Sequence, residues 1–273
     1  MPHWLNRSLL AALAVLCLTQ CGRPVPKQSR PPVLLAIFAH PDDEASVGPV
    51  LAKYAAAGVR VYLAVATDGS LGVTEHAGLA AGAAIADARA GELECAAKRL
   101  GLQSPIVLQL EDQLKMAAGL QPHIEQINTL RARVRVLFEQ LQPDAVITWP
   151  ASGWTGHPDH RLVSSVVTEV FQSRPWVRPA RLYYPAAPLG RLPPSHPLNA
   201  ASVDARWLAA DVAVSSANYE QAKQAWLCHR SQYTPAMIEQ LHRSLVATQG
   251  GTAQFMALPQ PRGKVTSLLP QRD

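Results

Sequence analysis

The sequence has no C-x-x-C pair, no basic patch interleaved with aromatic residues, and no glycine-rich loop of the kind that cradles phosphate. The first absence argues against a sulfur-bound metal, the second against nucleic-acid binding, and the third against phosphoester hydrolysis. Charged residues are also few, at 16% of 273 residues, against 48% hydrophobic residues. That balance allows one sizeable core and argues against a disordered chain or a coiled coil.

The N-terminal region is expected to lie outside the fold. Residues 1–20 have a basic start and an apolar run, Leu9–Leu18, that is too short to span a membrane comfortably, which is typical of a secretory signal. The following LTQC resembles a bacterial lipobox with Cys21 as the lipid-modified residue, although Gln20 stands where a small residue is usual. Residues 21–32 are Pro-rich and indicate an extended tether.

These signals predict a lipoprotein of the cell envelope, on its periplasmic or outer face and held at the membrane by a lipid on Cys21. The alternatives are an uncleaved N-terminal anchor and a soluble secreted protein. Beyond this region, Cys95 and Cys228 each lie within a helical pattern. They could pair in an oxidising compartment, but two cysteines of unknown separation are more often separate buried thiols.

Strand and helix patterns alternate from residue 33 onward. Short apolar runs predict strands, and segments with helical spacing predict the helices between them. The predicted strands are 33–39, 59–67, 105–110, 143–150, 180–185 and 210–215, and the predicted helices are 45–58, 85–100, 123–141, 157–173 and 218–232. This order predicts an α/β fold with a Rossmann-like, mostly parallel sheet and helices on both faces.

No second domain boundary stands out, so we expect a single domain over residues 33–250. Residues 251–273 form a C-terminal tail to which no element is assigned. The Pro-rich stretch 185–205 is expected to be a long loop and is a candidate wall of the substrate site, because long loops inside compact α/β domains are often functional.

Polar motifs follow three of the predicted strands. HPDDE (40–44) follows the first, TDG (67–69) the second, and WPASGWTGHPDH (149–160) the fourth. Ligands of open parallel sheets bind at the carboxyl ends of the strands. The fold therefore brings both histidine motifs to the same rim, although they are far apart in the sequence.

The two histidine motifs carry suitable ligands for zinc. His40 and Asp43 stand three apart across a proline-stiffened turn, and His157 and His160 stand three apart at a predicted helix start. Two histidines and one carboxylate make an open zinc shell with a position left for water. Asp42 and the remaining histidine have the chemistry of a general base and an oxyanion donor. The packed carboxylates also require a cation, because without one they would repel each other.

Each part of this pattern has a simpler explanation. Asp and Pro favour turns in any case, and Asp159 and Glu44 fit the acids that are favoured at helix starts. His229 lies in a helical pattern and is expected to be structural. Two H-P-D clusters at one sheet edge are much harder to explain by chance, so the metal hypothesis is favoured.

The same motifs resemble those of the PIG-L/LmbE-like zinc-dependent de-N-acetylases. AHPDDE and GHPDH carry the resemblance, and TDG, RAGELECAAKRLG (89–101), QPDAVIT (142–148) and KQAWLCHRSQ (223–232) follow in the family's order. The resemblance to this family covers roughly residues 33–235. The family often has an acidic residue after TDG, whereas this chain has Ser70.

The resemblance implies a role for each residue of the two motifs. His40, Asp43 and His160 match the zinc ligands, so the implied cofactor is Zn²⁺. Asp42 matches the general base, and His157 matches the histidine that stabilises the oxyanion. Asp159 is then expected to hydrogen-bond a nearby histidine and orient it.

The implied activity is removal of an N-acetyl or other N-acyl group from an amino-sugar-containing substrate, such as an N-acetylglucosamine conjugate. One alternative is a catalytically inactive, lipid-anchored sugar-binding protein that keeps its metal for structure. Another is an amidase that acts on a non-sugar amide. The expected partners are an amino-sugar or glycoconjugate small molecule and, through the lipid anchor, a membrane; nucleic acid is not expected.

Overall fold

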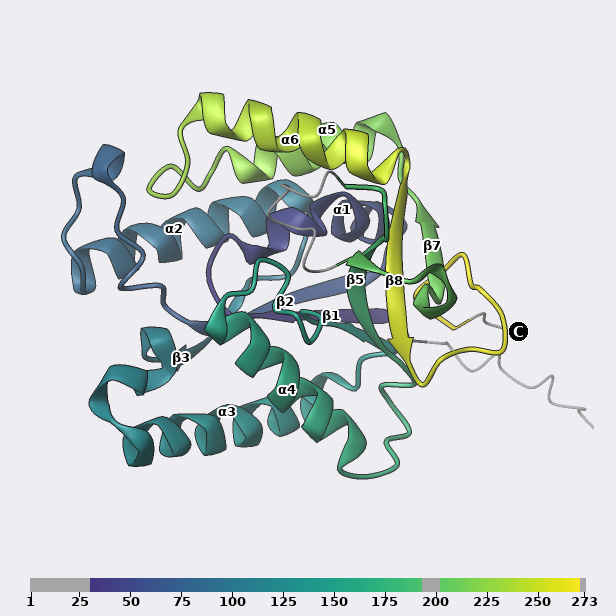
Figure 1. Ribbon diagram of the computed structural model, residues 1–273, viewed down its shortest axis with the longest axis horizontal. Helices are drawn as coiled ribbons and strands as arrows, with labels where there is room; N and C mark the ends of the chain where they lie inside the picture. The colour runs from purple at the N-terminus through teal and green to yellow at the C-terminus, as the bar shows by residue number, and fades with distance from the viewer. Residues whose placement is uncertain (1–29, 193–201, 271–273) are drawn as a thin grey trace, which may run out of the picture. The chain divides into compact units, whose positions relative to one another are not determined.

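Eight strands form one mixed sheet in the computed structural model, which describes residues 30–192 and 202–270 (Figure 1). Their order is β3-β2-β1-β4-β5-β8-β7, with β6 beside β5. The strands from β3 to β5 run parallel, and β8 runs antiparallel to both β5 and β7. The bounds are β1 Val33–Phe38, β2 Arg60–Thr67, β3 Ile106–Leu110, β4 Ala145–Ile147, β5 Leu182–Pro188, β6 Ser202–Val203, β7 Ala210–Ala213 and β8 Thr252–Leu258.

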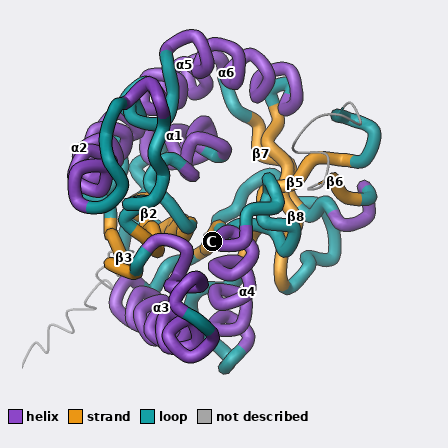
Figure 2. The backbone as a smooth tube through the Cα atoms, turned by 60° about the vertical axis from the view of Figure 1, so that its left-hand side comes forward, coloured by secondary structure: helices purple, strands orange, loops and turns teal. Residues whose placement is uncertain are grey.

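Helices cover both faces of the sheet (Figures 1 and 2). One face carries α1, α2 and α5, which pack against one another, and the other carries α3 and α4. A further helix, α6, packs on α5 and β8. The bounds are α1 Gly48–Ala56, α2 Ala83–Leu100, α3 Leu120–Leu141, α4 Pro158–Gln172, α5 Ser216–Trp226 and α6 Pro235–Gln249. The predicted α/β fold with a mostly parallel sheet is confirmed.

The central strand β1 lies in the core between the two helical layers. All six of its side chains are fully buried, as its continuous apolar run predicts. Alternate residues enter different cores: Leu34, Ala36 and Phe38 pack on the side of α1 and α2, and Leu35 and Ile37 pack on the side of α3 and α4. The strand that leads into HPDDE is therefore anchored on both faces.

The neighbours of β1 place the two histidine motifs beside each other. The chain leaves β1 to form β2 on one side and returns later to form β4 on the other. Such a reversal opens a crevice at the carboxyl ends of the two strands. Residues 39–46 follow β1 and residues 148–160 follow β4, so both motifs border this crevice.

The structure differs from the prediction after residue 226. Helix α5 ends at Trp226 and does not continue to residue 232, because the following segment is held against α2 and the turn after β1. Helix α6 was not predicted; its only buried residue is Ile238. Strand β8 lies beyond the expected boundary at residue 250 and pairs with β5 and β7, so the folded domain includes part of the expected tail. Residues 186–188, expected in a loop, belong to β5.

Several sequence predictions lie outside the described residues. They concern the signal peptide (1–20), Cys21, most of the tether (21–32) and residues 193–201 of the Pro-rich stretch. Among the helices that the structure does describe, none combines the length and the apolar character that a membrane crossing needs.

Cys95 and Cys228 form a disulfide, which corrects the expectation of separate thiols. Their Cα atoms are 5.9 Å apart, although 133 residues separate them in the sequence. Cys95 lies on α2, and Cys228 lies just beyond the end of α5, so the bond holds the segment after α5 against α2. The sequence could not reveal this distance, because it depends on how two remote helices pack.

Replacing both Cys95 and Cys228 with Ser is expected to lower the free energy of unfolding by about 2–4 kcal/mol. A cross-link between residues 133 apart restricts the unfolded chain, and the variant loses this restriction. Urea denaturation of the oxidised protein and of the variant measures the difference. Reductant should bring the wild-type protein to the stability of the variant, and equal stability of all three samples would contradict the pairing.

Candidate active site

The HPDDE motif forms a tight turn directly after β1, and Asp43 holds it together. Its Oδ2 atom accepts hydrogen bonds from the backbone N–H groups of Ala39 and His40, both at 2.9 Å, and from Trp149 Nε1 at 3.1 Å. Oδ1 instead faces His160 Nε2 at 3.1 Å. Burial by itself raises the pKa of Asp43, but His160 and His40 outweigh it and lower the pKa below its usual value. Asp43 is therefore an ionised carboxylate with one oxygen fully engaged and the other aimed at His160.

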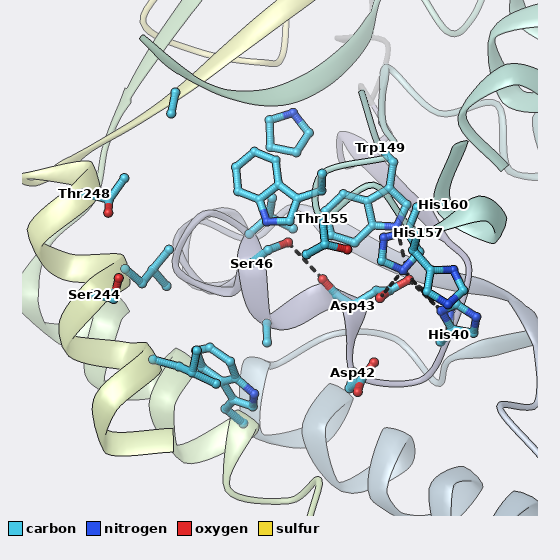
Figure 3. Close-up of a pocket in the computed structure, with 18 of the residues that line it drawn as sticks. His40, Asp42, Asp43, Ser46, Trp149, Thr155, His157, His160, Ser244 and Thr248 are labelled. Atoms are coloured by element: carbon cyan, nitrogen blue, oxygen red, sulfur yellow. Dashed lines mark hydrogen bonds and ion pairs between the residues drawn. The ribbon is translucent and has the colours of Figure 1, made fainter. Parts of the chain in front are cut away.

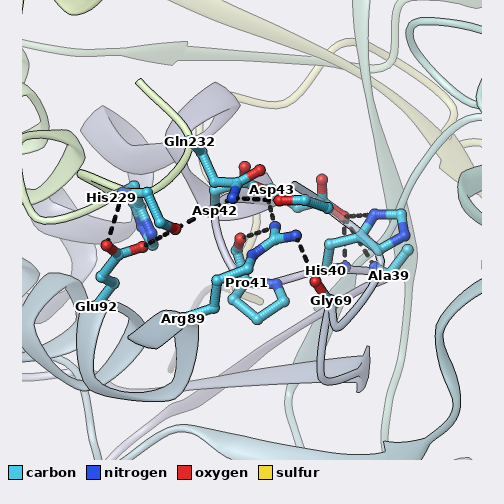
Figure 4. A network of polar contacts seen from close by, with 12 residues as sticks. Ala39, His40, Pro41, Asp42, Asp43, Gly69, Arg89, Glu92, His229 and Gln232 are labelled. Atoms are coloured by element: carbon cyan, nitrogen blue, oxygen red, sulfur yellow. Dashed lines mark hydrogen bonds and ion pairs between the residues drawn. The ribbon is translucent and has the colours of Figure 1, made fainter. Parts of the chain in front are cut away.

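Asp42 occupies a backbone conformation that side-chain-bearing residues rarely adopt, with φ at 117°. Such outliers cluster at functional sites, where the surrounding structure enforces them. The Asp42 carboxylate lies 3.3 Å from Arg89 Nη2 (Figure 4). Burial raises the pKa of Asp42 to about 6, although the positive charge of Arg89 opposes this shift. Asp42 thus has the raised proton affinity of a general base.

Arg89 fixes the turn from the side of α2. It donates to the carbonyl oxygens of Gly69, at 3.1 Å, and Pro41, at 2.6 Å. Gly69 has φ at +66°, and a Cβ atom there would lie only 2.4 Å from the Arg89 guanidinium. The glycine of the TDG motif therefore leaves room for the arginine that contacts Asp42.

His40 is oriented by two further carboxylates. Its Nε2 lies 3.1 Å from Asp159 Oδ2 and 3.4 Å from Asp112 Oδ1. Burial alone lowers the pKa of His40, but the hydrogen bonds to Asp112 and Asp159 and the charge on Asp43 raise it to about 10. Because Nε2 faces only acceptors, it carries the proton in the neutral ring, and Nδ1 then presents a lone pair.

His160, in the first turn of α4, is oriented in the same way. Its Nδ1 lies 3.0 Å from the carbonyl oxygen of Gly153, which can only accept, so the proton is on Nδ1 and Nε2 presents a lone pair. The ring stacks on Trp149 with centroids 4.7 Å apart and 13° between the planes. Trp149 therefore fixes the position of His160 with its ring and that of Asp43 with its indole N–H.

Electron-pair donors of His40, Asp43 and His160 lie close together (Figure 3). His40 Nδ1 lies 3.2 Å from His160 Nε2 and 3.7 Å from Asp43 Oδ2, and Asp43 Oδ1 lies 3.1 Å from His160 Nε2. Ligand atoms at ~2.1 Å from a tetrahedral zinc ion are ~3.4 Å from one another. Two imidazole lone pairs and a carboxylate at these separations repel each other unless a cation lies between them, so the donor set fits a metal ion.

His157 caps the start of α4 beside this group. Its Nδ1 accepts the backbone N–H of Asp159 at 3.2 Å, so the proton of the neutral ring is on Nε2. Burial lowers the pKa of His157, and the nearby His40 and His160 lower it further. One ligand atom each from His157, His40 and His160 lies within 4.8 Å of the others, so His157 is also close enough to serve as a metal ligand.

Two buried charged residues at the site are missing from the sequence prediction, Asp112 and Arg89. Asp112 follows the carboxyl end of β3, as the other polar motifs follow their strands. The expectation that ligands bind at the carboxyl ends of parallel strands could therefore have identified it. It also forms, with His40 and Asp159, a second group whose ligand atoms lie within 4.8 Å of one another. Arg89 interrupts the apolar stripe of α2, and a lone charge in such a stripe is the signal that could have identified it.

Glu44 and His229 form a buried ion pair. Glu44 lies in the first turn of a short 3-10 helix, Asp43–Ser46, as expected. His229 has the expected structural role, but it lies beyond the end of α5 and not within a helix, which corrects its predicted placement. Glu44 Oε1 lies 2.6 Å from His229 Nε2, and both side chains are almost completely buried. Burial alone lowers the pKa of His229, but Glu44 outweighs it and raises the pKa above its usual value. The pair ties the HPDDE turn to the segment after α5.

That segment lies against α2 and beside the HPDDE turn (Figure 4). Glu92 on α2 accepts hydrogen bonds from the backbone N–H and the hydroxyl of Ser231, both at 2.7 Å. Burial, and then the carboxylates of Asp42 and Asp43, raise the pKa of Tyr233 above its usual value, so its hydroxyl keeps its proton. Tyr233 and the histidine motifs line a single cavity of about 740 Å³.

Comparison with known proteins identifies relatives of this chain. The model of the family described as "PIG-L: GlcNAc-PI de-N-acetylase" matches residues 35–171, half of the chain. A 1D-myo-inositol 2-acetamido-2-deoxy-alpha-D-glucopyranoside deacetylase 2 from Catenulispora acidiphila is 33% identical over 147 residues, 48% of each protein. A deacetylase of the same description from Salinispora arenicola is 31% identical over 172 residues, 57% of this chain and 56% of the relative. The chain thus spans about half the length of the curated relatives it matches.

Solved structures share the fold at low sequence identity. The N,N'-diacetylchitobiose deacetylase from Pyrococcus horikoshii superposes with a TM-score of 0.60 at 19% identity, covering 84% of each chain. The 4-carboxy-2-hydroxymuconate hydratase GalB from Pseudomonas putida also reaches 0.60, at 16% identity over 88% of this chain and 100% of that protein. The fold by itself therefore does not decide between a hydrolase and a hydratase. The matched residues 35–171 include both histidine motifs, and on this evidence the chain belongs to the PIG-L family.

Proposed function

We propose that this protein is a zinc-dependent hydrolase that removes an N-acetyl or other N-acyl group from an amino-sugar-containing substrate. The observation that carries the proposal is the convergence of two imidazole lone pairs and one carboxylate, with a second buried carboxylate beside them. The curated relatives named above are deacetylases of an acetamido sugar, and a structural neighbour deacetylates diacetylchitobiose. These relatives support an amino sugar as the substrate class.

In this proposal His40 holds zinc through Nδ1, His160 through Nε2 and Asp43 through Oδ1. His40 donates a hydrogen bond from Nε2 to Asp159, and His160 donates one from Nδ1 to the carbonyl oxygen of Gly153, which supports these tautomers. Zinc in such a site lowers the pKa of a bound water and polarises the acyl carbonyl.

Asp42 is the general base of the proposed reaction. It accepts a proton from the attacking water and returns it to the nitrogen of the leaving amine, so that the amide C–N bond breaks as a neutral amine forms. The raised pKa of Asp42 supports both transfers. Retention of this base also argues against a catalytically inactive sugar-binding protein.

His157 is the proposed donor to the oxygen that becomes negative in the tetrahedral intermediate. Its cap interaction uses Nδ1 as an acceptor, which leaves Nε2–H available to donate from a neutral ring. The lowered pKa of His157 favours this neutral form.

We further propose that the protein works in the cell envelope as a lipoprotein anchored through Cys21, with a soluble secreted protein as the alternative. The signal-like residues 1–20 support this location. The Cys95–Cys228 pair supports it independently, because disulfides persist in oxidising compartments.

Metal removal is expected to abolish the activity. A chelator should stop acetate release from N-acetylglucosamine conjugates, and added zinc should restore it. The variants His40→Ala and His160→Ala should each lose bound zinc, measured by plasma mass spectrometry. The variant His76→Ala, at an exposed histidine away from the cavity, is the matched control and should keep its metal. Full activity of metal-free protein would refute the metal-dependent mechanism.

Replacing Asp42 with Asn is expected to lower kcat by about 10²–10⁴ with zinc still bound, because the base is lost and the ligands remain. Asn tolerates the left-handed backbone at this position, so the turn should persist. Acetate release and zinc content are measured together, and Asp87→Asn, on the exposed side of α2, is the control. Unchanged acetate release in the zinc-loaded Asp42→Asn variant would exclude Asp42 as the base.

Replacing His157 with Asn is expected to lower kcat by about 10²–10³, the usual cost of removing one oxyanion donor. Asn is itself a favoured helix cap, so α4 should still begin at this residue. The experiment compares kcat, KM and zinc content with those of the wild-type protein. If zinc is lost together with activity, His157 is a metal ligand, and the assignment as oxyanion donor is wrong.

A further inference from the structure

The cavity at the site has two ends that differ in charge. Its charged and imidazole lining residues all surround the proposed metal site: His40, Asp42, Asp43, Arg89, Asp112, His157 and His160. Among the described residues, the lining that comes from positions 185–188, 226 and 240–255 contains no charged side chain. A substrate that reaches from one end to the other therefore passes from a highly polar region to an uncharged one.

We call the uncharged end the apolar arm. It lies between α6, the end of α5 and the strands β5 and β8, and Figure 3 shows Ser244 and Thr248 of α6 across the cavity from Asp43. Its apolar lining consists of Pro185, Ala186, Ala187, Pro188, Trp226, Leu241, Leu245, Ala253 and Phe255. Its polar lining consists only of hydroxyl and amide side chains, namely Gln240, Ser244, Thr248, Gln249, Thr252 and Gln254.

Helix α6 presents partly exposed side chains to the cavity, although one of them, Leu245, also packs against the core. Ile238 is its only buried residue, whereas Leu241, on the cavity wall, remains 38% exposed. Apolar surface left open beside a catalytic centre gains free energy when an apolar ligand covers it. A charged ligand group would lose its hydration in the arm without finding a charged side chain among the described residues that line it.

The cavity is also larger than an N-acetylated monosaccharide requires. Its volume of about 740 Å³ corresponds to ~25 water molecules at ~30 Å³ each. An N-acetylhexosamine has ~15 non-hydrogen atoms, and each of them occupies no more than the ~30 Å³ of one water molecule. Space for a further group therefore remains in the cavity.

We propose that the apolar arm binds an uncharged alkyl or aryl substituent of the amino-sugar substrate. The natural substrate is then a hydrophobic glycoconjugate and neither a free amino sugar nor one bearing a phosphate or carboxylate at this end. This inference rests on the proposed deacylase function and adds the substrate's second recognition element. All the residues that define the arm lie after position 171, outside the segment that the family model matches.

The test compares four compounds: methyl and octyl glycosides of N-acetylglucosamine, the methyl glycoside of N-octanoylglucosamine, and N-acetylglucosamine 1-phosphate. Burial of one methylene improves binding ~4-fold, so at least one octyl-bearing compound should exceed the methyl glycoside in kcat/KM by about tenfold or more. A gain with the octyl glycoside assigns the arm to the aglycone, and a gain with the octanoyl amide assigns it to the acyl chain. The phosphate should show no gain. Equal values for all four compounds, or a preference for the phosphate, would overturn the proposal.

A pair of variants on α6 provides the matched control. Leu241→Asp places a charge in the arm, whereas Met237→Asp places the same charge on the same helix outside the cavity lining; the two native side chains are 38% and 43% exposed. The measured quantity is kcat/KM for the preferred octyl or octanoyl compound divided by kcat/KM for the methyl glycoside of N-acetylglucosamine. This ratio should fall toward one in Leu241→Asp and stay at the wild-type value in Met237→Asp. An unchanged ratio in Leu241→Asp would contradict the assignment.

The failure of this proposal can be distinguished from failure of the proposed function. If none of the compounds releases its acid, the deacylase function is wrong, and the arm is judged by calorimetric binding of the same compounds, which needs no turnover. If an octyl or octanoyl compound binds more tightly than the methyl glycoside of N-acetylglucosamine, and Leu241→Asp removes this difference in affinity, the proposed role of the arm is still supported. Equal binding of the octyl and methyl compounds overturns it.

Discussion

The site depends on an electrostatic conflict among closely spaced electron-pair donors, which a bound cation or a proton on His40 relieves. Two imidazole nitrogens with lone pairs lie 3.2 Å apart, and an ionised carboxylate oxygen lies 3.1 Å from one of them. Further carboxylates, Asp112 and Asp159, hold His40 from its other side. Without a metal, the protein balances this charge by protonating His40, whose pKa rises to about 10. In the proposed metal site a bound cation would displace that proton, so the carboxylates that orient His40 also favour positive charge at the site.

The rest of the fold keeps these donors from moving apart. β1 is buried on both faces and fixes the start of the HPDDE turn, and three N–H groups hold one oxygen of Asp43. Trp149, just after β4, contacts both Asp43 and His160 and so joins the two motifs. The candidate ligands are thus positioned by neighbouring parallel strands, which are among the most rigid parts of such a domain.

The opposite wall of the site comes from a later part of the chain. α2 presents Arg89, Glu92 and Cys95 at three-residue spacing, and they contact in turn Asp42, Ser231 and Cys228. The segment after α5 is held by these contacts and by the Glu44–His229 pair, and it leads into α6 and the apolar arm. The region matched by the family model therefore carries the chemistry, while the region after it shapes the space that a substrate enters.

The sequence by itself determined the fold class, the positions of both histidine motifs and their meeting at one sheet edge. Each of these follows from local signals: a buried apolar run, a turn with proline, and alternating strand and helix patterns. Only the tertiary structure decided the Cys95–Cys228 bond, the Glu44–His229 pair and the course of α6 and β8. Those features join residues as far as 185 positions apart, or use weakly patterned segments whose burial depends on what packs over them. Local propensity carries no information about such partners, whereas the packed domain brings them within hydrogen-bonding distance.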